Sequence, residues 1–141
     1  MPTPKNDVLI WLKYARNDLG TAEREMNAYR NPRLRPYEII LHHCHQCAEK
    51  SLKAFLLCRT GKHPFHHDLG DLLLECEKVD NRFKNQRMEN HCLWLNTFWN
   101  VKYPDFTLSL DGVIASRGVN SAKRIYDFVS DILGHGKVYY K

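Results

Sequence analysis

The 141-residue sequence lacks any long apolar run. No stretch approaches the roughly 20 apolar residues that a membrane-spanning helix requires. The first residues, Met-Pro-Thr-Pro-Lys, contain none of the apolar core of a secretion signal. These absences argue against a membrane protein and make the cytoplasm the expected location.

Alternation of apolar and polar residues, internal repeats and low-complexity stretches are also missing, so no β-sheet and no repeat architecture is expected. The five cysteines are an odd number without a secretion signal. We therefore predict reduced thiols that pack as small hydrophobic groups, and no disulfide framework.

Charge alone does not identify a partner. The formal net charge is +5, and eight histidines add positive charge below neutral pH. This surplus permits an acidic partner or nucleic acid, but we interpret it first as a solvated basic surface.

Apolar residues recur at alternating steps of four and three along most of the chain, which is the spacing of one helix face. This pattern predicts helices over about 8–29, 37–59, 69–79, 85–101 and 112–133. Asn6 or Asp7 is expected to cap the first helix, Asp68 the third, and Gly61 to end the second. Helix 37–59 carries two apolar rows and should lie centrally. The sequence thus predicts one all-α domain over 1–141, an up-and-down bundle of four to five helices with its core between about 7 and 133.

Residues 46–54 read Gln-Cys-Ala-Glu-Lys-Ser-Leu-Lys-Ala, and a His-Asp-Leu step follows at 67–69. This order resembles the HEPN family, in which a Gln-Gln-Ala-Ala-Glu-Lys-x-Leu-Lys-Ala helix precedes His-Asp-Leu. Residues 102–105, Lys-Tyr-Pro-Asp, look like the Arg-Tyr-Pro loop before the last long helix of that family. The likeness extends over about 7–133.

Three residues depart from the family pattern. His45 and Cys47 stand where Gln and Ala are common, and we expect them to change the chemistry of the helix surface. Lys102 stands where Arg is usual, and lysine cannot present the bidentate fork of a guanidinium group.

The resemblance implies a helical bundle that forms a homodimer. It also implies a non-catalytic partner of a separately encoded minimal nucleotidyltransferase, often in a toxin–antitoxin pair. Some branches of the family instead cleave RNA, so a metal-independent endoribonuclease toxin is the alternative function.

The nuclease branches use an Arg, four to six residues and a His near the start of a late helix, where the His acts as acid or base. The corresponding segment after Lys102 offers no His before His135. The pairs Arg35/His42 and Arg59/His66 have the spacing but lie elsewhere, and Arg87/His91 is one residue short. We therefore assign no catalytic residue.

Five residues form the predicted nucleotide- or phosphate-binding site: Glu49, Lys50, Lys53, Lys102 and Tyr103. Lys50 and Lys53 share one helix face, where two ammonium groups would favour a polyanion, and Tyr103 would stack on a base. The placement of Lys102 and Tyr103 beside that helix is implied by the resemblance alone. An ordinary i,i+4 ion pair between Glu49 and Lys53 is the competing interpretation.

Two further features carry weaker hypotheses. His43 and Cys47 share a helix face, but a second pair of metal ligands is not evident, so no metal and no cofactor is predicted. Trp94, Phe98 and Trp99 offer more aromatic surface than one bundle face needs, which favours a homodimer interface. A helix covered on two sides within a monomer is the alternative.

Overall fold

The computed structural model describes residues 5–134 and is all-α over that range, as predicted. The α-helices are α1 (Lys5–Asn27), α2 (Tyr37–Thr60), α3 (Leu69–Val79), α4 (Gln86–Asn96) and α5 (Gly112–Ile132). Two 3-10 turns, η1 (Pro32–Leu34) and η2 (Asn81–Phe83), precede α2 and α4. No helix within 5–134 combines the length and apolar character needed to cross a membrane.

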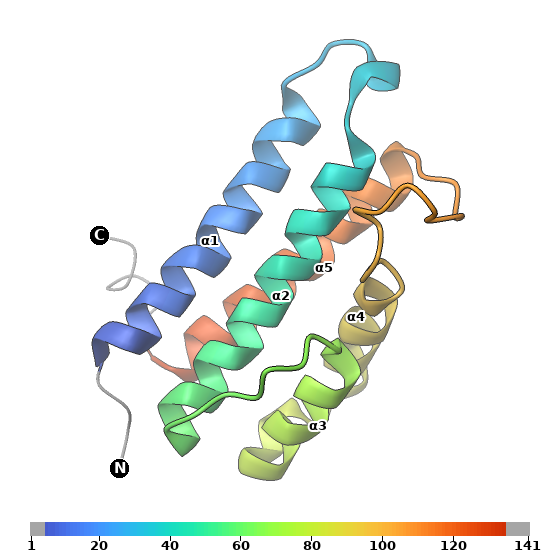
Figure 1. Cartoon of the computed structure of the whole chain (residues 1–141). Coiled ribbons are helices and arrows are strands. Elements are labelled where there is room, and N and C mark those ends of the chain that lie inside the picture. The colour runs from blue at the N-terminus through green and yellow to red at the C-terminus, as the bar shows by residue number, and fades with distance from the viewer. Residues whose placement is uncertain (1–4, 135–141) are drawn as a thin grey trace.

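Helix α2 is the centre of the bundle. It contacts α1, α3, α4 and α5, and it runs in the opposite direction to α1 along almost its whole length (Figure 1). The shorter α3 and α4 pack against each other beside the C-terminal half of α2, and α5 contacts α1, α2 and α4. The central position predicted for this helix is therefore confirmed.

Burial follows the predicted apolar rows. The fully buried positions of α1 are Val8, Leu12, Ala15, Leu19 and Ala22. On α2 both rows are covered, including Leu41, Cys44, Ala48 and Phe55 in one and Ile40, Cys47 and Ala54 in the other. Burying one apolar stripe per helix is the main stabilisation of such a bundle.

The helix ends show which local signals operate. Gly61 adopts a left-handed conformation with φ of 81° and caps α2, and the Asp68 carboxylate accepts from the Asp71 N–H at the start of α3. Both caps match the expectation. Helix α1, however, begins at Lys5, so Asn6 and Asp7 lie inside it, where an acidic residue in the first turn faces the positive end of the helix dipole.

Helix α4 ends at Asn96, earlier than the predicted end near 101. The Thr97 hydroxyl donates to the Trp94 carbonyl at 2.7 Å, and the Phe98 N–H bonds to the carbonyl of Leu95, three residues back. Such bonds tighten the last turn and end the regular helix. The chain then turns repeatedly through 97–103.

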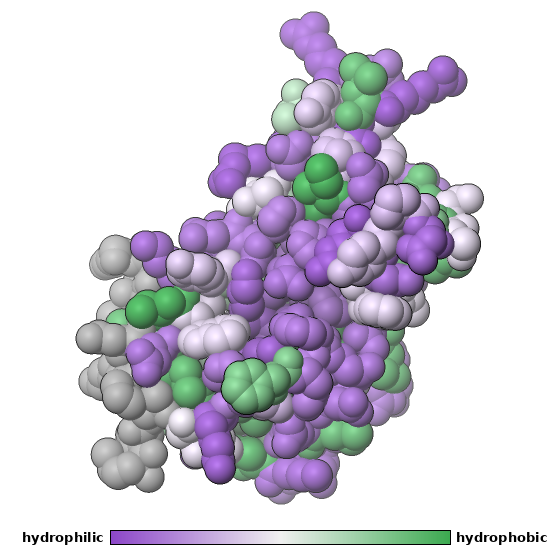
Figure 2. Space-filling model, in the orientation of Figure 1, coloured by the Kyte–Doolittle hydropathy of each residue, from purple (hydrophilic) through white to green (hydrophobic). Residues whose placement is uncertain are grey.

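This early end redistributes the aromatic residues. Phe98 is buried against Leu41 and Val101, and the Arg117 guanidinium lies 4.3 Å from the centre of the half-buried Trp94 ring. Only Trp99 of the three stays largely exposed. Figure 2 shows a face that is mainly hydrophilic, with separate hydrophobic residues in place of one continuous patch.

Candidate functional site

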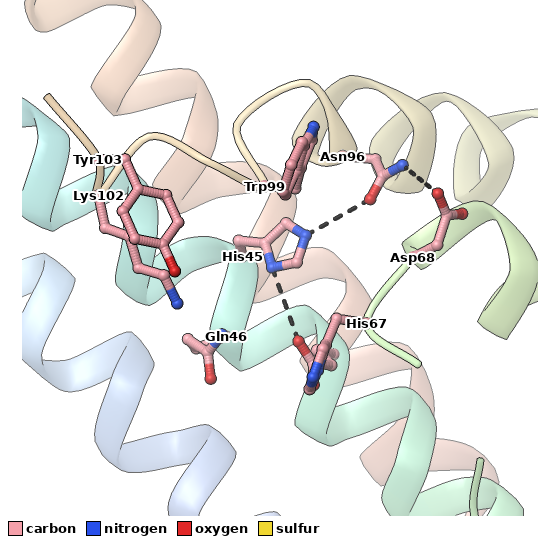
Figure 3. A pocket seen from close by; sticks show the side chains of 9 residues that line it. His45, Gln46, His67, Asp68, Asn96, Trp99, Lys102 and Tyr103 are labelled. Carbon is pink, nitrogen blue, oxygen red and sulfur yellow. Dashed lines mark hydrogen bonds and ion pairs between the residues drawn. The ribbon is translucent and has the colours of Figure 1, made fainter. Parts of the chain in front are cut away.

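A pocket of about 550 Å³ opens where α2, the start of α3 and the segment after α4 meet. Its lining residues are His45, Gln46, Glu49, His67, Asp68, Asn96, Trp99, Lys102 and Tyr103. Figure 3 shows Lys102 and Tyr103 on one side, Asn96 and Asp68 on the other, and His45 between them. Three stretches far apart in the sequence thus build one site.

The pocket has a buried floor and an exposed rim. His45 and Glu49, one helical turn apart on α2, are 3% and 4% exposed. At the rim, Trp99 and Tyr103 are 62% and 52% exposed, and the Lys102 ammonium lies 5.4 Å from the centre of the Tyr103 ring. The site therefore combines polar groups inside with aromatic faces and one cation at its mouth.

Glu49 uses its two carboxylate oxygens differently. Oε2 accepts from the Lys53 ammonium at 3.1 Å and from Nδ1 of His67. Oε1 lies 3.9 Å from Nδ1 of His45 and has no hydrogen-bond partner among the described residues. A buried acceptor without a donor is costly, so this atom marks a place where the site is chemically incomplete.

Asn96 is held in one orientation by its neighbours. Its Nδ2 donates to the Asp68 carboxylate at 3.0 Å, while its Oδ1 accepts from the Leu69 N–H at 3.0 Å. Nε2 of His45 lies 3.5 Å from the same Oδ1. Burial lowers the pKa of His45 below its ordinary value, although the nearby Glu49 carboxylate raises it in part.

A second ionic cluster lies on the α1 side of α2. Asp18 accepts from the Lys50 ammonium at 2.7 Å and from Nδ1 of His43 at 2.8 Å. Burial raises the pKa of Asp18, but these hydrogen bonds outweigh it and lower the pKa below its ordinary value. The cluster ties α1 to α2.

The predicted site residues separate into two groups. Glu49, Lys102 and Tyr103 line the pocket together, whereas Lys50 and Lys53 are not among its lining residues. Without a ligand, the Lys50 ammonium pairs with Asp18 and the Lys53 ammonium with Glu49. The ion pair within α2, the competing interpretation, is formed.

The sequence interpretation misses most of the floor. It places His45 on the helix surface, but this residue is buried in the pocket, because α3 and the end of α4 cover that side of α2. Cys47 is likewise fully buried. The four-residue spacing of His45 and Glu49 is a usable signal, whereas the positions of Asn96 and Trp99 depend on where α4 ends.

Comparison with known proteins identifies the family. The model of the HEPN domain matches residues 8–132. The chain belongs to the HEPN domain family. The HEPN assignment made from the motifs is therefore confirmed.

Two solved structures support the HEPN fold. The crystal structure of TT1696 from Thermus thermophilus has a TM-score of 0.73 at 24% identity, covering 89% of this chain and 98% of that chain. The crystal structure of ST0689, an archaeal HEPN homologue, has a TM-score of 0.66 at 23% identity, covering 89% and 97%. No curated protein sequence matches the chain.

The Arg–His pairs with nuclease-like spacing in this HEPN chain engage other groups. Arg35 donates to a backbone carbonyl of the preceding loop. Arg59 pairs with Asp80 at 3.5 Å, while His66 lies 3.4 Å from Glu75. Their contacts thus give no support to a nuclease site of the Arg–His type.

The cysteines of the His42–Cys47 tract pack in the core. Burial raises the pKa of Cys44 to about 12 and that of Cys47 well above its ordinary value, so both thiols stay protonated at neutral pH. Over residues 5–134, no group of three or more His, Cys, Asp or Glu side chains is placed to hold a metal ion.

Proposed function

We propose that this HEPN protein is the non-catalytic partner of a separately encoded minimal nucleotidyltransferase, in a toxin–antitoxin-like pair, and that it binds a nucleotide in its pocket. The observation that carries the proposal is the composition of the pocket. The exposed rings of Trp99 and Tyr103 could stack on a base, and the Lys102 ammonium could bind a phosphate. The buried polar groups of His45 and Glu49 could form hydrogen bonds that fix the orientation of the ligand.

The proposal retains Glu49, Lys102 and Tyr103 as binding residues. Lys102 is exposed, its ammonium lies 5.4 Å from the centre of the Tyr103 ring, and no carboxylate of the described residues forms an ion pair with it, so its charge is available for a phosphate group. In this proposal Lys50 and Lys53 do not contact the ligand. Each neutralises a carboxylate, Asp18 and Glu49 respectively, and so supports the packing of the helices that form the pocket.

Two measurements test the proposal. The gene neighbourhood should contain a small nucleotidyltransferase, and co-expression of that protein with this one should give a complex that survives gel filtration. Calorimetric titration of the isolated HEPN protein with ATP should show binding that Lys102→Ala weakens and Phe65→Ala, a change of an exposed residue outside the pocket lining, does not. Absence of both the complex and nucleotide binding would rule the proposal out.

A metal-independent endoribonuclease is the second candidate, and one observation favours it. His45 and His67 both approach the Glu49 carboxylate from within one pocket. One imidazole would take the proton of an RNA 2′-hydroxyl as it attacks phosphorus, and the other would protonate the departing 5′-oxygen. Lys102 would stabilise the charge on the phosphorane. Cleavage of RNA in EDTA that is abolished by His67→Ala would establish this function in place of the first.

We also propose a homodimer, although less aromatic surface is exposed than the sequence suggested. Phe98 packs internally, so the aromatic surplus on which the expectation rests reduces to Trp99. Leu74 on α3 and Leu93 on α4 are 55% and 51% exposed and provide additional apolar surface. Light scattering at tens of micromolar should give twice the monomer mass, and a monomer mass would refute the dimer.

A further inference from the structure

A second groove lies between α4 and α5, and it shares no lining residue with the proposed nucleotide pocket. Nδ1 of His91 lies 2.9 Å from Oγ of the buried Ser121, which joins the two helices beside this groove. The groove, called here the α4–α5 groove, has a volume of about 450 Å³ and is lined by Asn85, Arg87, Met88, His91, Arg124, Asp127, Phe128 and Asp131. Its lining thus comes from the start of α4 and the second half of α5.

Three arginines gather around the His91 ring. Arg87 precedes it by one helical turn on α4, and Arg124 lines the same groove from α5. Arg117 lies further back on α5, with its guanidinium 4.3 Å from the centre of the Trp94 ring. Burial and then the charges of these three guanidinium groups lower the pKa of His91 below its ordinary value. The three positive charges are therefore close enough to act on one side chain.

These charges are not neutralised within the part of the chain that the structure describes. No carboxylate of residues 5–134 forms an ion pair with Arg87, Arg117 or Arg124. The neighbouring Lys123, by contrast, donates to Asp127 at 3.0 Å, so one of the two acids in the lining already has a cation. Because like charges repel, an anion in the groove would lower the electrostatic energy of this cluster.

The arrangement favours a row of anionic groups over a single anion. Arg117 and Arg124 are seven residues apart, which places their Cα atoms about 10 Å apart along α5. Guanidinium groups match phosphate oxygens through paired N–H donors. The groove offers little for a nucleobase to stack on, because Phe128 packs against Phe83 and Arg117 covers one face of Trp94. A plain phosphate chain therefore fits better than a nucleic-acid strand.

We propose that the α4–α5 groove binds a short chain of phosphate groups, such as tripolyphosphate, at a site separate from the nucleotide pocket. Arg87 and Arg124 bind the phosphates from the two helices, and Arg117 extends the row of positive charge toward Trp94. Asp131, the second acid of the lining, limits the affinity by repulsion. The site does not require that the nucleotide pocket functions as proposed.

Calorimetric titration of the full chain with tripolyphosphate, at neutral pH and low salt, tests the site. Arg124→Gln removes one charged contact and should weaken binding by roughly five- to tenfold, which is moderate for a charged hydrogen bond because the groove is open to water. Arg33→Gln is the matched control, since Arg33 is an exposed arginine of η1 outside the lining. The control should weaken binding by less than about twofold.

Asp131→Asn should change the affinity in the opposite direction. The variant removes a negative charge from the lining and should tighten tripolyphosphate binding by about two- to threefold. A gain in affinity cannot result from a loss of folding, so this variant keeps the proposal testable even if Arg124→Gln is unstable. Unchanged or weaker binding by Asp131→Asn would count against the groove.

Nuclear magnetic resonance locates the bound tripolyphosphate. The indole N–H signal of Trp94, whose ring lies against Arg117, should shift during the titration. The indole signal of Trp99 reports on the nucleotide pocket instead. A titration that shifts the Trp99 signal and leaves that of Trp94 in place would put the phosphates in the nucleotide pocket and overturn the proposal.

The remaining outcomes concern the chemistry of the ligand. Equal weakening by Arg124→Gln and Arg33→Gln would show that tripolyphosphate responds only to net charge, and absence of binding would exclude the site outright. Hexaglutamate or a single-stranded oligonucleotide that binds more tightly than tripolyphosphate, and loses affinity in Arg124→Gln, would assign the groove to a different polyanion. None of these results bears on ATP binding in the nucleotide pocket, so the two proposals fail separately.

Discussion

The buried ion pair between Glu49 and Lys53 gives the sharpest prediction about the folded state. Both side chains are about 5% exposed or less, and the Lys53 ammonium lies 3.1 Å from Oε2 of Glu49. Lys53→Met keeps most of the length of the side chain and removes the charge together with the hydrogen bond that the ammonium donates to Glu49. The carboxylate of Glu49 would then stay buried with His67 as its remaining donor.

The expected loss of stability is large. Two unit charges at this distance attract by about 5 kcal/mol in a medium of effective dielectric constant near 20. Removing one member of a buried pair typically costs roughly 3–5 kcal/mol, because the other charge is left without compensation. Since His67 still donates to Glu49, we expect about 3 kcal/mol for Lys53→Met.

Urea denaturation followed by far-ultraviolet circular dichroism measures this loss. Lys123→Met is the matched control, because Lys123 and Asp127 form the same i,i+4 pair at 3.0 Å with about half of each side chain exposed. The control should lose no more than about 0.5 kcal/mol. Equal losses in the two variants would refute the claim that burial makes Lys53 a structural residue.

Three further predictions concern pH, thiols and packing. Burial lowers the pKa of His45 and His91, so below about pH 6.5 the unfolded chain binds more protons than the folded one, and the melting temperature should fall from pH 7 to pH 5; a rise would contradict this. Among the five cysteines, Cys58 is half-buried and the others are buried, so a thiol reagent should label one group in the native protein and five after unfolding. In Gly118→Ala the new Cβ would lie 2.6 Å from Cδ2 of Leu41, which is fully buried; the crowding should exceed the gain in helix propensity and cost about 1 kcal/mol in urea denaturation, and a stabilised variant would show that Leu41 yields freely.

The helices were predictable because burial in a bundle repeats with the period of the helix itself. Leu12, Ala15 and Leu19 are buried because their spacing of three and four places them on one face of the helix. No information on long-range contacts is needed to predict this. The end of α4 was not predictable in this way. Trp99 continues the apolar stripe of that helix in the sequence, but the Thr97 hydroxyl bonds to the backbone and the regular helix has already ended.

The site was predictable only where its contacts are local. The Glu49–Lys53 pair is four residues apart and legible in the sequence, and the HEPN resemblance added Lys102 and Tyr103. The bond from His67 to Glu49 joins residues 18 apart, and that from Lys50 to Asp18 joins residues 32 apart. Such pairings depend on how the helices pack. The spacing within α2 could not reveal that Lys50 pairs with Asp18, and Lys50 was therefore predicted to bind a ligand.

His45 is a departure from the HEPN pattern, and it supplies the last prediction. The family commonly has Gln at this position, and a side-chain amide carries an NH2 group that would donate to the buried Oε1 of Glu49, which has no hydrogen-bond partner among the described residues. His45→Gln should therefore be more stable in urea denaturation than His45→Leu by about 1–3 kcal/mol, because only the amide gives this oxygen a donor. Equal stability of the two variants would show that Oε1 of Glu49 gains nothing from a donor at position 45.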